Sequence, residues 1–98
     1  MRMAENPNKT VTVRIEGRVQ GVFYRAWIEQ TARALHLDGS VRNRRDGSVE
    51  AVFSGPAAQI EVMLKRCAEG PPDAEVTEVS VTHVGGTVAP GFKVLATG

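Results

Sequence analysis

The chain has 98 residues, which is enough for one domain and too few for two. Hydrophobic residues make up 42% of it and charged residues 23%, as in an ordinary globular protein. The formal net charge of +1 excludes a strong overall field toward nucleic acid or an anionic membrane. No apolar run approaches the length of a membrane helix, and the lone cysteine, Cys67, favours the reducing cytoplasm.

The chain begins with a polar segment, residues 1–9, that lacks the apolar centre of a signal peptide. We therefore expect a flexible lead-in there, followed by a single domain over residues 10–98. The first element of that domain is predicted to be a half-buried strand, because Val11, Val13 and Ile15 alternate with polar residues.

A glycine-bracketed loop and an amphipathic helix follow the first strand. Gly17 and Gly21 bracket the loop, and over residues 22–37 the apolar positions recur with the period of a helix. Asp38-Gly39 supplies the signal that ends this helix. The predicted apolar face of the helix comprises Phe23, Tyr24, Trp27, Ile28, Thr31 and Leu35.

A hairpin and a second helix are predicted next. The hairpin strands span residues 40–44 and 48–53, and the turn signal Arg45-Asp46-Gly47 lies between them. The second helix starts at Ser54-Gly55-Pro56, with one of the first two residues as its cap and the proline in its first turn. Its buried stripe is predicted to contain Ile60, Met63, Leu64 and Cys67.

Two further strands complete the predicted fold. A strand over residues 75–84 has Val79 and Val81 in register and Val76 out of phase, which indicates either a bulge or a later start of the strand. A short last strand starts at Phe92. The order β-α-β-β-α-β, with a short extra C-terminal strand, predicts an α+β, ferredoxin-like split β-α-β plait. We expect a mostly antiparallel sheet with two helices on one face.

This topology brings two polar segments to one end of the domain. The first two strands run in the same direction, so the loop Gly17–Gly21 and the strand end at residues 42–44 reach the same edge. The loop glycines and the free amides at the helix start favour a bound phosphate or carboxylate. Arg25, in the first helical turn, carries a guanidinium that matches two phosphoryl oxygens, although a solvated surface arginine is the alternative.

Asn43 is the second candidate. It shares a side of its strand with Val41 and therefore points toward the helix-covered face, where an amide needs partners. Either it bonds a nearby backbone group or, because an amide both accepts and donates, it holds an attacking water. His36 and His83 lack any pattern of catalysis or metal binding, and Cys67 is expected to be a buried structural thiol. No zinc-type spacing, Asp-rich loop or Walker A sequence is present.

Two motifs in the expected order resemble one known family. The stretch Gly17–Arg25, GRVQGVFYR, closely resembles the signature loop of the acylphosphatase family. The segment Gly39–Asn43 is similar to the family's second motif, which continues here with Gly47, Val49 and Gly55. The family usually has a bulky aromatic where this chain has Ser40. Because Ser40 faces away from Asn43, we expect a changed surface or stability there and an intact site.

The resemblance implies a hydrolase without metal or cofactor that cleaves acyl phosphates to a carboxylate and inorganic phosphate. It implies that Arg25 holds the phosphoryl group and that Asn43 orients the attacking water. The phosphate-binding amides would belong to Gln20, Gly21, Val22, Phe23 and Tyr24. Since acyl phosphates carry a good leaving group, positioning and charge neutralisation can suffice, and the substrate's own phosphate can take the proton.

Two other functions stay open at this point. A binding module would grip phosphate or a carbamoyl-phosphate-like ligand for a partner without efficient turnover. The same plait serves RNA-binding domains, and Arg42, Arg44 and Arg45 form a basic patch beside Arg14 and Arg18. The outward positions of the central strands lack stacking aromatics, so we expect these arginines to be solvated or to steer an anionic substrate. The leading expectation is a cytoplasmic monomer that acts on a small-molecule acyl phosphate and binds neither nucleic acid nor membrane; its physiological acyl group stays open.

Overall fold

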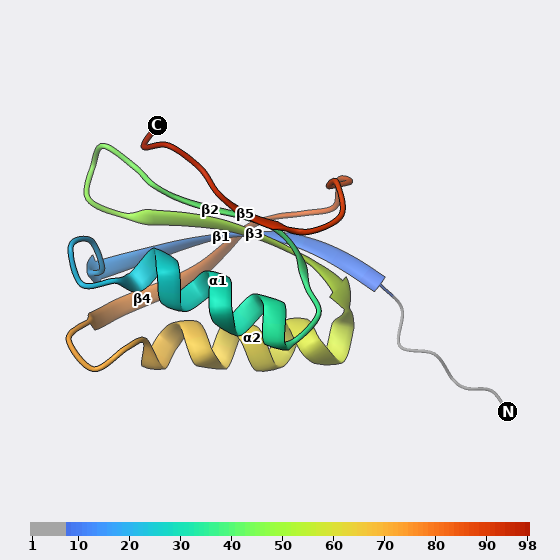
Figure 1. Ribbon diagram of the computed structural model, residues 1–98, viewed down its shortest axis with the longest axis horizontal. Helices are drawn as coiled ribbons and strands as arrows, with labels where there is room; N and C mark the ends of the chain where they lie inside the picture. Colours follow the sequence, from blue (N-terminus) through green and yellow to red (C-terminus); the bar gives the residue numbers. More distant parts are fainter. Residues whose placement is uncertain (1–7) are drawn as a thin grey trace, which may run out of the picture.

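The computed structural model describes residues 8–98 and contains five strands and two helices (Figure 1). Most of the expected lead-in, residues 1–9, lies outside the described residues, and its last two residues belong to the first strand. The elements in chain order are β1 Asn8–Arg18, α1 Tyr24–Ala34, β2 Asp38–Asn43, β3 Val49–Pro56, α2 Ala57–Glu69, β4 Glu75–Val84 and β5 Phe92–Val94.

The strands form one sheet in the order β4-β1-β3-β2-β5. β3 lies between β1 and β2 and is antiparallel to both, so β1 and β2 run in the same direction without touching. The short β5 pairs in parallel with the outer edge of β2. Both helices cover the same face of the sheet (Figure 1). The predicted α+β ferredoxin-like plait, with its mostly antiparallel sheet and short extra strand, is confirmed. Within residues 8–98 neither helix is long and apolar enough to cross a membrane.

The core lies between the sheet and the two helices. The inner side chains of the central strands and of both helices are almost completely buried, and burial of each large one stabilises the fold by about 1.5–3 kcal/mol. On the C-terminal side, Phe53 stacks on Phe92 with ring centroids 5.8 Å apart, which attaches β5 to the core. The predicted alternation is confirmed in β1 and β3, but in β4 it is not, because Val79 is partly buried and Val81 is 45% exposed. Of the predicted α2 stripe, Ile60, Met63 and Cys67 are buried and Leu64 is partly buried.

The first helix is shorter than the predicted residues 22–37. It begins at Tyr24, and Phe23, predicted on its apolar face, precedes it with a side chain that is 83% exposed. The helix ends because His36 adopts a left-handed conformation with φ 59°. The His36 amide donates to Arg33 O at 3.0 Å and the Leu37 amide to Ala32 O at 2.9 Å, which closes the last turn. The predicted stop at Asp38-Gly39 is therefore wrong, since β2 already begins at Asp38.

The predicted cap of the second helix is also wrong. β3 continues through Ser54 and Gly55 to Pro56, because these residues stay paired with the start of β1. Ser54 Oγ hydrogen-bonds Thr10 Oγ1 at 2.7 Å across that pair, and within residues 8–98 no side chain caps α2. The helix begins at Ala57, after an extended Pro56.

The predicted bulge in the last long strand is confirmed. The pairing of β1 with β4 shifts register between Thr12 and Val13 and again between Glu16 and Gly17. These shifts twist β4, which forms one edge of the sheet.

Gly39 is a point of close approach between β2 and β3. Its φ is 138°, and a Cβ there would lie 1.8 Å from Val52 O. We expect Gly39→Ala to lower the free energy of unfolding by about 3 kcal/mol, because the two strands must separate to admit the methyl group. Gly86→Ala is the matched control, since Gly86 also has a positive φ but no atom within 4 Å of the added Cβ. Urea denaturation measures both variants, and an equal loss in the two would contradict the close approach.

A second prediction concerns alkaline pH. Tyr24 Oη donates to the Cys67 carbonyl oxygen at 2.6 Å inside the core, and burial raises the pKa of Tyr24 above its ordinary value. Burial also raises the pKa of the Cys67 thiol to about 12. Both groups bind their protons more tightly in the folded state, so their contribution is complete at neutral pH and is lost as the pH rises above about 9.

We therefore expect the free energy of unfolding to fall by about 3 kcal/mol between pH 8 and pH 10.5, of which the thiol contributes about 2 kcal/mol. Urea denaturation at several pH values measures this loss. Cys67→Ala removes the thiol and should flatten the dependence, leaving the share that comes from Tyr24. An unchanged pH dependence in Cys67→Ala would contradict the assignment.

Candidate functional site

One pocket of about 400 Å³ lies where the β1–α1 loop (residues 19–23) meets the end of β2. Figure 1 shows this loop and the β2–β3 turn (residues 44–48) at the same end of the molecule, as the shared direction of β1 and β2 requires. The pocket brings together both predicted catalytic residues, Arg25 and Asn43. Its lining consists of Val19, Gly21, Phe23, Tyr24, Arg25, Ala26, Glu29, Asn43 and Val94.

The backbone of the β1–α1 loop is wound so that several amides are free. Gly21 has φ 73° and Phe23 has φ 62°, so two left-handed residues alternate with ordinary ones, a geometry that turns successive N–H groups to one side. Within residues 8–98, no backbone hydrogen bond uses the amides of residues 21–25; the first helical bond runs from the Trp27 amide to Phe23 O at 3.0 Å. These donors lie at the positive end of the α1 dipole, an arrangement that favours an anion.

The two loop glycines have different physical roles. A Cβ on Gly21 would meet no protein atom within 4 Å, so its positive φ is what requires glycine. A Cβ on Gly17 would lie 2.1 Å from Glu75 O, so that glycine allows β4 to approach β1. Gly17 was expected to let the backbone approach a ligand, but in the structure it is required for the packing of β1 against β4.

Arg25 is the second residue of α1 and is half-buried at the pocket. In the described part of the chain, no hydrogen bond or ion pair engages its guanidinium. One turn further along the helix, Glu29 also lines the pocket, but its carboxylate is paired with Arg33 Nη2 at 3.1 Å. Arg33 donates in addition to Phe92 O at 2.7 Å, which ties α1 to β5.

Asn43 carries the most unusual group in the pocket. Its Oδ1 is buried and has no hydrogen-bond partner among residues 8–98. Leaving such an acceptor unsatisfied costs about 1–3 kcal/mol. The sequence left two alternatives open for Asn43, a bond to a nearby backbone group or a bound water. Within residues 8–98, no backbone group donates to Asn43 Oδ1.

Gln20 and Val22 lie in the loop but do not line the pocket. The Val22 side chain is buried in the core, and the Gln20 side chain turns away to the β2–β3 turn. The resemblance implied a role for the backbone amides of these two residues, and a side chain outside the pocket is compatible with such a role.

Glu29 and Val94 are among the lining residues that were not singled out from the sequence. Glu29 follows Arg25 by four residues, and this helical spacing was a usable signal that both reach one face. Val94 reaches the pocket because β5 pairs with β2. This is a long-range contact that local sequence patterns do not predict.

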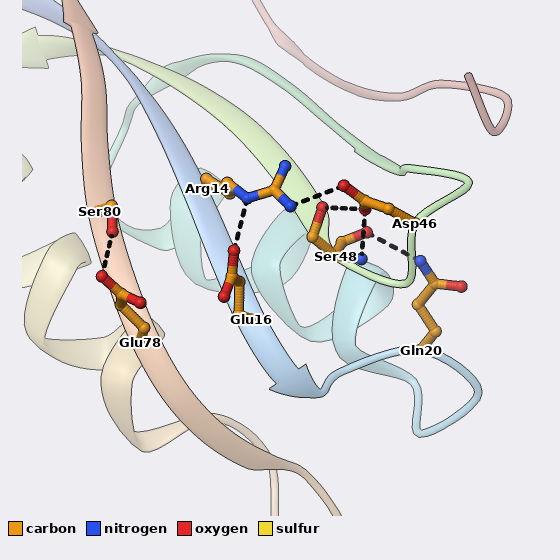
Figure 2. Close-up of polar contacts among 7 residues, drawn as sticks. All are labelled: Arg14, Glu16, Gln20, Asp46, Ser48, Glu78 and Ser80. Carbon is orange, nitrogen blue, oxygen red and sulfur yellow. Dashed lines mark hydrogen bonds and ion pairs between the residues drawn. The ribbon is translucent and has the colours of Figure 1, made fainter.

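The arginines that suggested nucleic acid are largely paired with carboxylates. Arg14 donates to Glu16 and to Asp46, each at 2.6 Å, as Figure 2 shows. Arg42 and Arg44 both reach Glu50, at 3.2 and 3.5 Å.

Asp46 also accepts from the hydroxyl and the amide of Ser48, and these bonds together with Arg14 hold the pKa of the Asp46 carboxyl well below its usual range. Hydrogen bonds to Glu16 and Asp46 raise the pKa of Arg14. The outer face of the sheet thus carries balanced charge at these positions.

Metal-ligating side chains are scattered over the described residues. No group of three His, Cys, Asp or Glu side chains gathers there in a way that could hold a metal ion. His36 ends α1, His83 lies on β4, and Cys67 is a buried free thiol in α2, as expected from its place in the helix stripe.

Similarity to known proteins extends over nearly the whole chain. A family model described as acylphosphatase matches residues 11–94. An acylphosphatase of Rhodospirillum rubrum is 55% identical over 85 residues, which cover 87% of this chain and 93% of that protein.

Solved structures agree with this. An acylphosphatase from Coxiella burnetii superposes with a TM-score of 0.86 at 32% identity, covering 96% of this chain and 100% of that one. The crystal structure of acylphosphatase from Bacillus subtilis gives a TM-score of 0.84 at 30% identity, over 89% and 98% of the two chains. The resemblance seen in the two motifs is confirmed, and the chain belongs to the acylphosphatase family of hydrolases.

Proposed function

We propose that this chain hydrolyses acyl phosphates, with Arg25 and the β1–α1 loop holding the phosphoryl group and Asn43 orienting the attacking water. The observation that carries these roles is the buried, unpartnered Oδ1 of Asn43, which shares a pocket with a free guanidinium and a set of free amides. An acceptor and a group of donors that face one cavity match a water molecule and an anion, respectively.

The phosphoryl group would lie against the amides of residues 20–24, at the positive end of α1. These amides carry partial charge and need no reorganisation when a dianion arrives, because the left-handed backbone already directs them. Arg25 adds a full positive charge and a planar pair of donors for two phosphoryl oxygens. Charge that develops on the phosphoryl oxygens during the reaction is thereby stabilised.

The water would donate a hydrogen bond to Asn43 Oδ1 and direct its lone pair at phosphorus. A bond forms between the water oxygen and phosphorus, and the bond between phosphorus and the carboxyl oxygen breaks, releasing the carboxylate. The water proton passes to a phosphoryl oxygen. A carboxylate is a good leaving group, so no protein nucleophile, strong base or metal ion is needed in this scheme.

The same proposal extends to the form in which the protein works. We propose that residues 10–98 act as a monomeric, cytoplasmic domain without metal or cofactor, on a small-molecule acyl phosphate rather than on nucleic acid. The buried free thiol of Cys67 and the carboxylate partners of Arg14, Arg42 and Arg44 support this reading.

Hydrolysis of benzoyl phosphate tests the assigned residues. We expect Arg25→Ala to lower kcat/KM by about 10²–10³-fold and to weaken competitive inhibition by inorganic phosphate, because the anion loses its charged partner. Asn43→Ala should lower kcat by about 10²-fold and leave phosphate inhibition nearly unchanged. Arg66→Ala and Asn8→Ala, which remove exposed side chains of the same types away from the pocket, are the matched controls.

Full activity of both site variants would refute the assigned roles. Phosphate binding at Arg25 without turnover in the parent protein would instead indicate a binding module. The reaction is also expected to proceed at the same rate after treatment with EDTA, and a loss restored by a divalent cation would contradict the metal-free scheme.

A further inference from the structure

The Gln20 side chain bridges the two halves of the site from outside the pocket. Its Nε2 donates to Ser48 O at 2.8 Å and to Arg44 O at 2.9 Å, so both amide hydrogens are used. Figure 2 shows the side chain reaching from the β1–α1 loop to the β2–β3 turn. Over residues 8–98, no other hydrogen bond joins this loop to this turn.

The two carbonyls that Gln20 holds lie next to Asn43. Arg44 follows Asn43 in the chain, and Ser48 precedes Val49, the residue that pairs with Asn43 across the β2–β3 ladder. Within the turn, the Arg44 amide donates to Ser48 O at 2.8 Å and the Gly47 amide to Arg44 O at 3.1 Å. Gln20 therefore donates to the same two carbonyls that accept the hydrogen bonds within the turn. These carbonyls belong to the residues directly beyond the Asn43–Val49 pair.

The turn is also held from the side of β1. Asp46 Oδ1 accepts from the amide and the hydroxyl of Ser48, and Asp46 Oδ2 accepts from Arg14 (Figure 2). Ser48 itself is only 3% exposed. With one side fixed to β1, the Gln20 bonds determine how far the β1–α1 loop lies from the turn.

We propose that Gln20 is a positioning residue that sets the separation between the phosphate-holding loop and Asn43. The proposal rests on the function proposed above, in which the loop holds the phosphoryl group and Asn43 the water. In-line attack requires these two partners at a defined distance, and a misplacement of about 1 Å can cost on the order of 10²-fold in rate. The Gln20 side chain neither lines the pocket nor reacts, so it acts through Asn43.

The test separates the chemical step from phosphate binding. Gln20→Ala removes both donors, and Gln20→Glu keeps the size of the side chain but places carboxylate oxygens against two carbonyls. We expect each to lower kcat for benzoyl phosphate by about 10- to 100-fold. The inhibition constant of inorganic phosphate should change less than about threefold, because Arg25 and the loop amides remain. Gln59→Ala is the matched control, since Gln59 Nε2 also donates to a backbone carbonyl, that of Leu35, at 3.4 Å. Gln59 does not line the pocket.

A double-mutant cycle with Asn43→Ala supplies the decisive comparison. If Gln20 acts through Asn43, adding Gln20→Ala to Asn43→Ala should lower kcat by less than about twofold further. If Asn43→Ala is itself impaired and Gln20→Ala lowers its kcat by the same factor as in the parent protein, the positioning role of Gln20 is overturned and the role of Asn43 stands. Full activity of Asn43→Ala by itself would refute the proposed role of Asn43 and this proposal with it. A parallel loss of kcat, phosphate inhibition and thermal stability in both Gln20 variants would show a purely structural role and also overturn it.

Discussion

The site depends on the antiparallel pairing of β3 with both β1 and β2. One strand placed between two others forces those two to run in the same direction, and their carboxyl ends then meet at one edge. That edge receives the β1–α1 loop from one strand and Asn43 from the other, although these segments lie far apart in the sequence. The buried side chains of β1 and β3 hold this arrangement, so the geometry of the pocket is a consequence of the core.

In the proposed mechanism, backbone conformation supplies much of the chemistry at this edge. Left-handed residues at Gly21 and Phe23 leave the loop amides free to donate, and the helix that follows adds its dipole. In the proposed mechanism, these donors let a nearly neutral chain bind an anion with only one added arginine, Arg25. The arginines on the outer face of the sheet, Arg14 and Arg42, bond carboxylates, whereas the Arg25 guanidinium has no such partner in residues 8–98. The proposed mechanism needs only such fixed donors and one acceptor.

Local patterns predicted the strands, the α2 stripe and the meeting of Arg25 with Asn43, because alternation and helical period report directly on burial. They failed where a residue adopts a conformation unusual for its type. Phe23 and His36 take positive φ without being glycine, and each displaces an end of α1 from its predicted place. The cap at Ser54 failed because pairing with β1 prolongs β3. The bridge made by Gln20 and the approach of Val94 are tertiary contacts, which spacing along the chain does not encode.

The central claim is that water on the Asn43 side attacks phosphorus while the loop holds the phosphoryl group. Hydrolysis of benzoyl phosphate in water enriched in oxygen-18, followed by mass spectrometry of both products, tests this most directly. The account predicts that the heavy oxygen from solvent appears in inorganic phosphate and that the benzoate carries none. Solvent oxygen in the benzoate would show attack at the carbonyl carbon and would contradict the account.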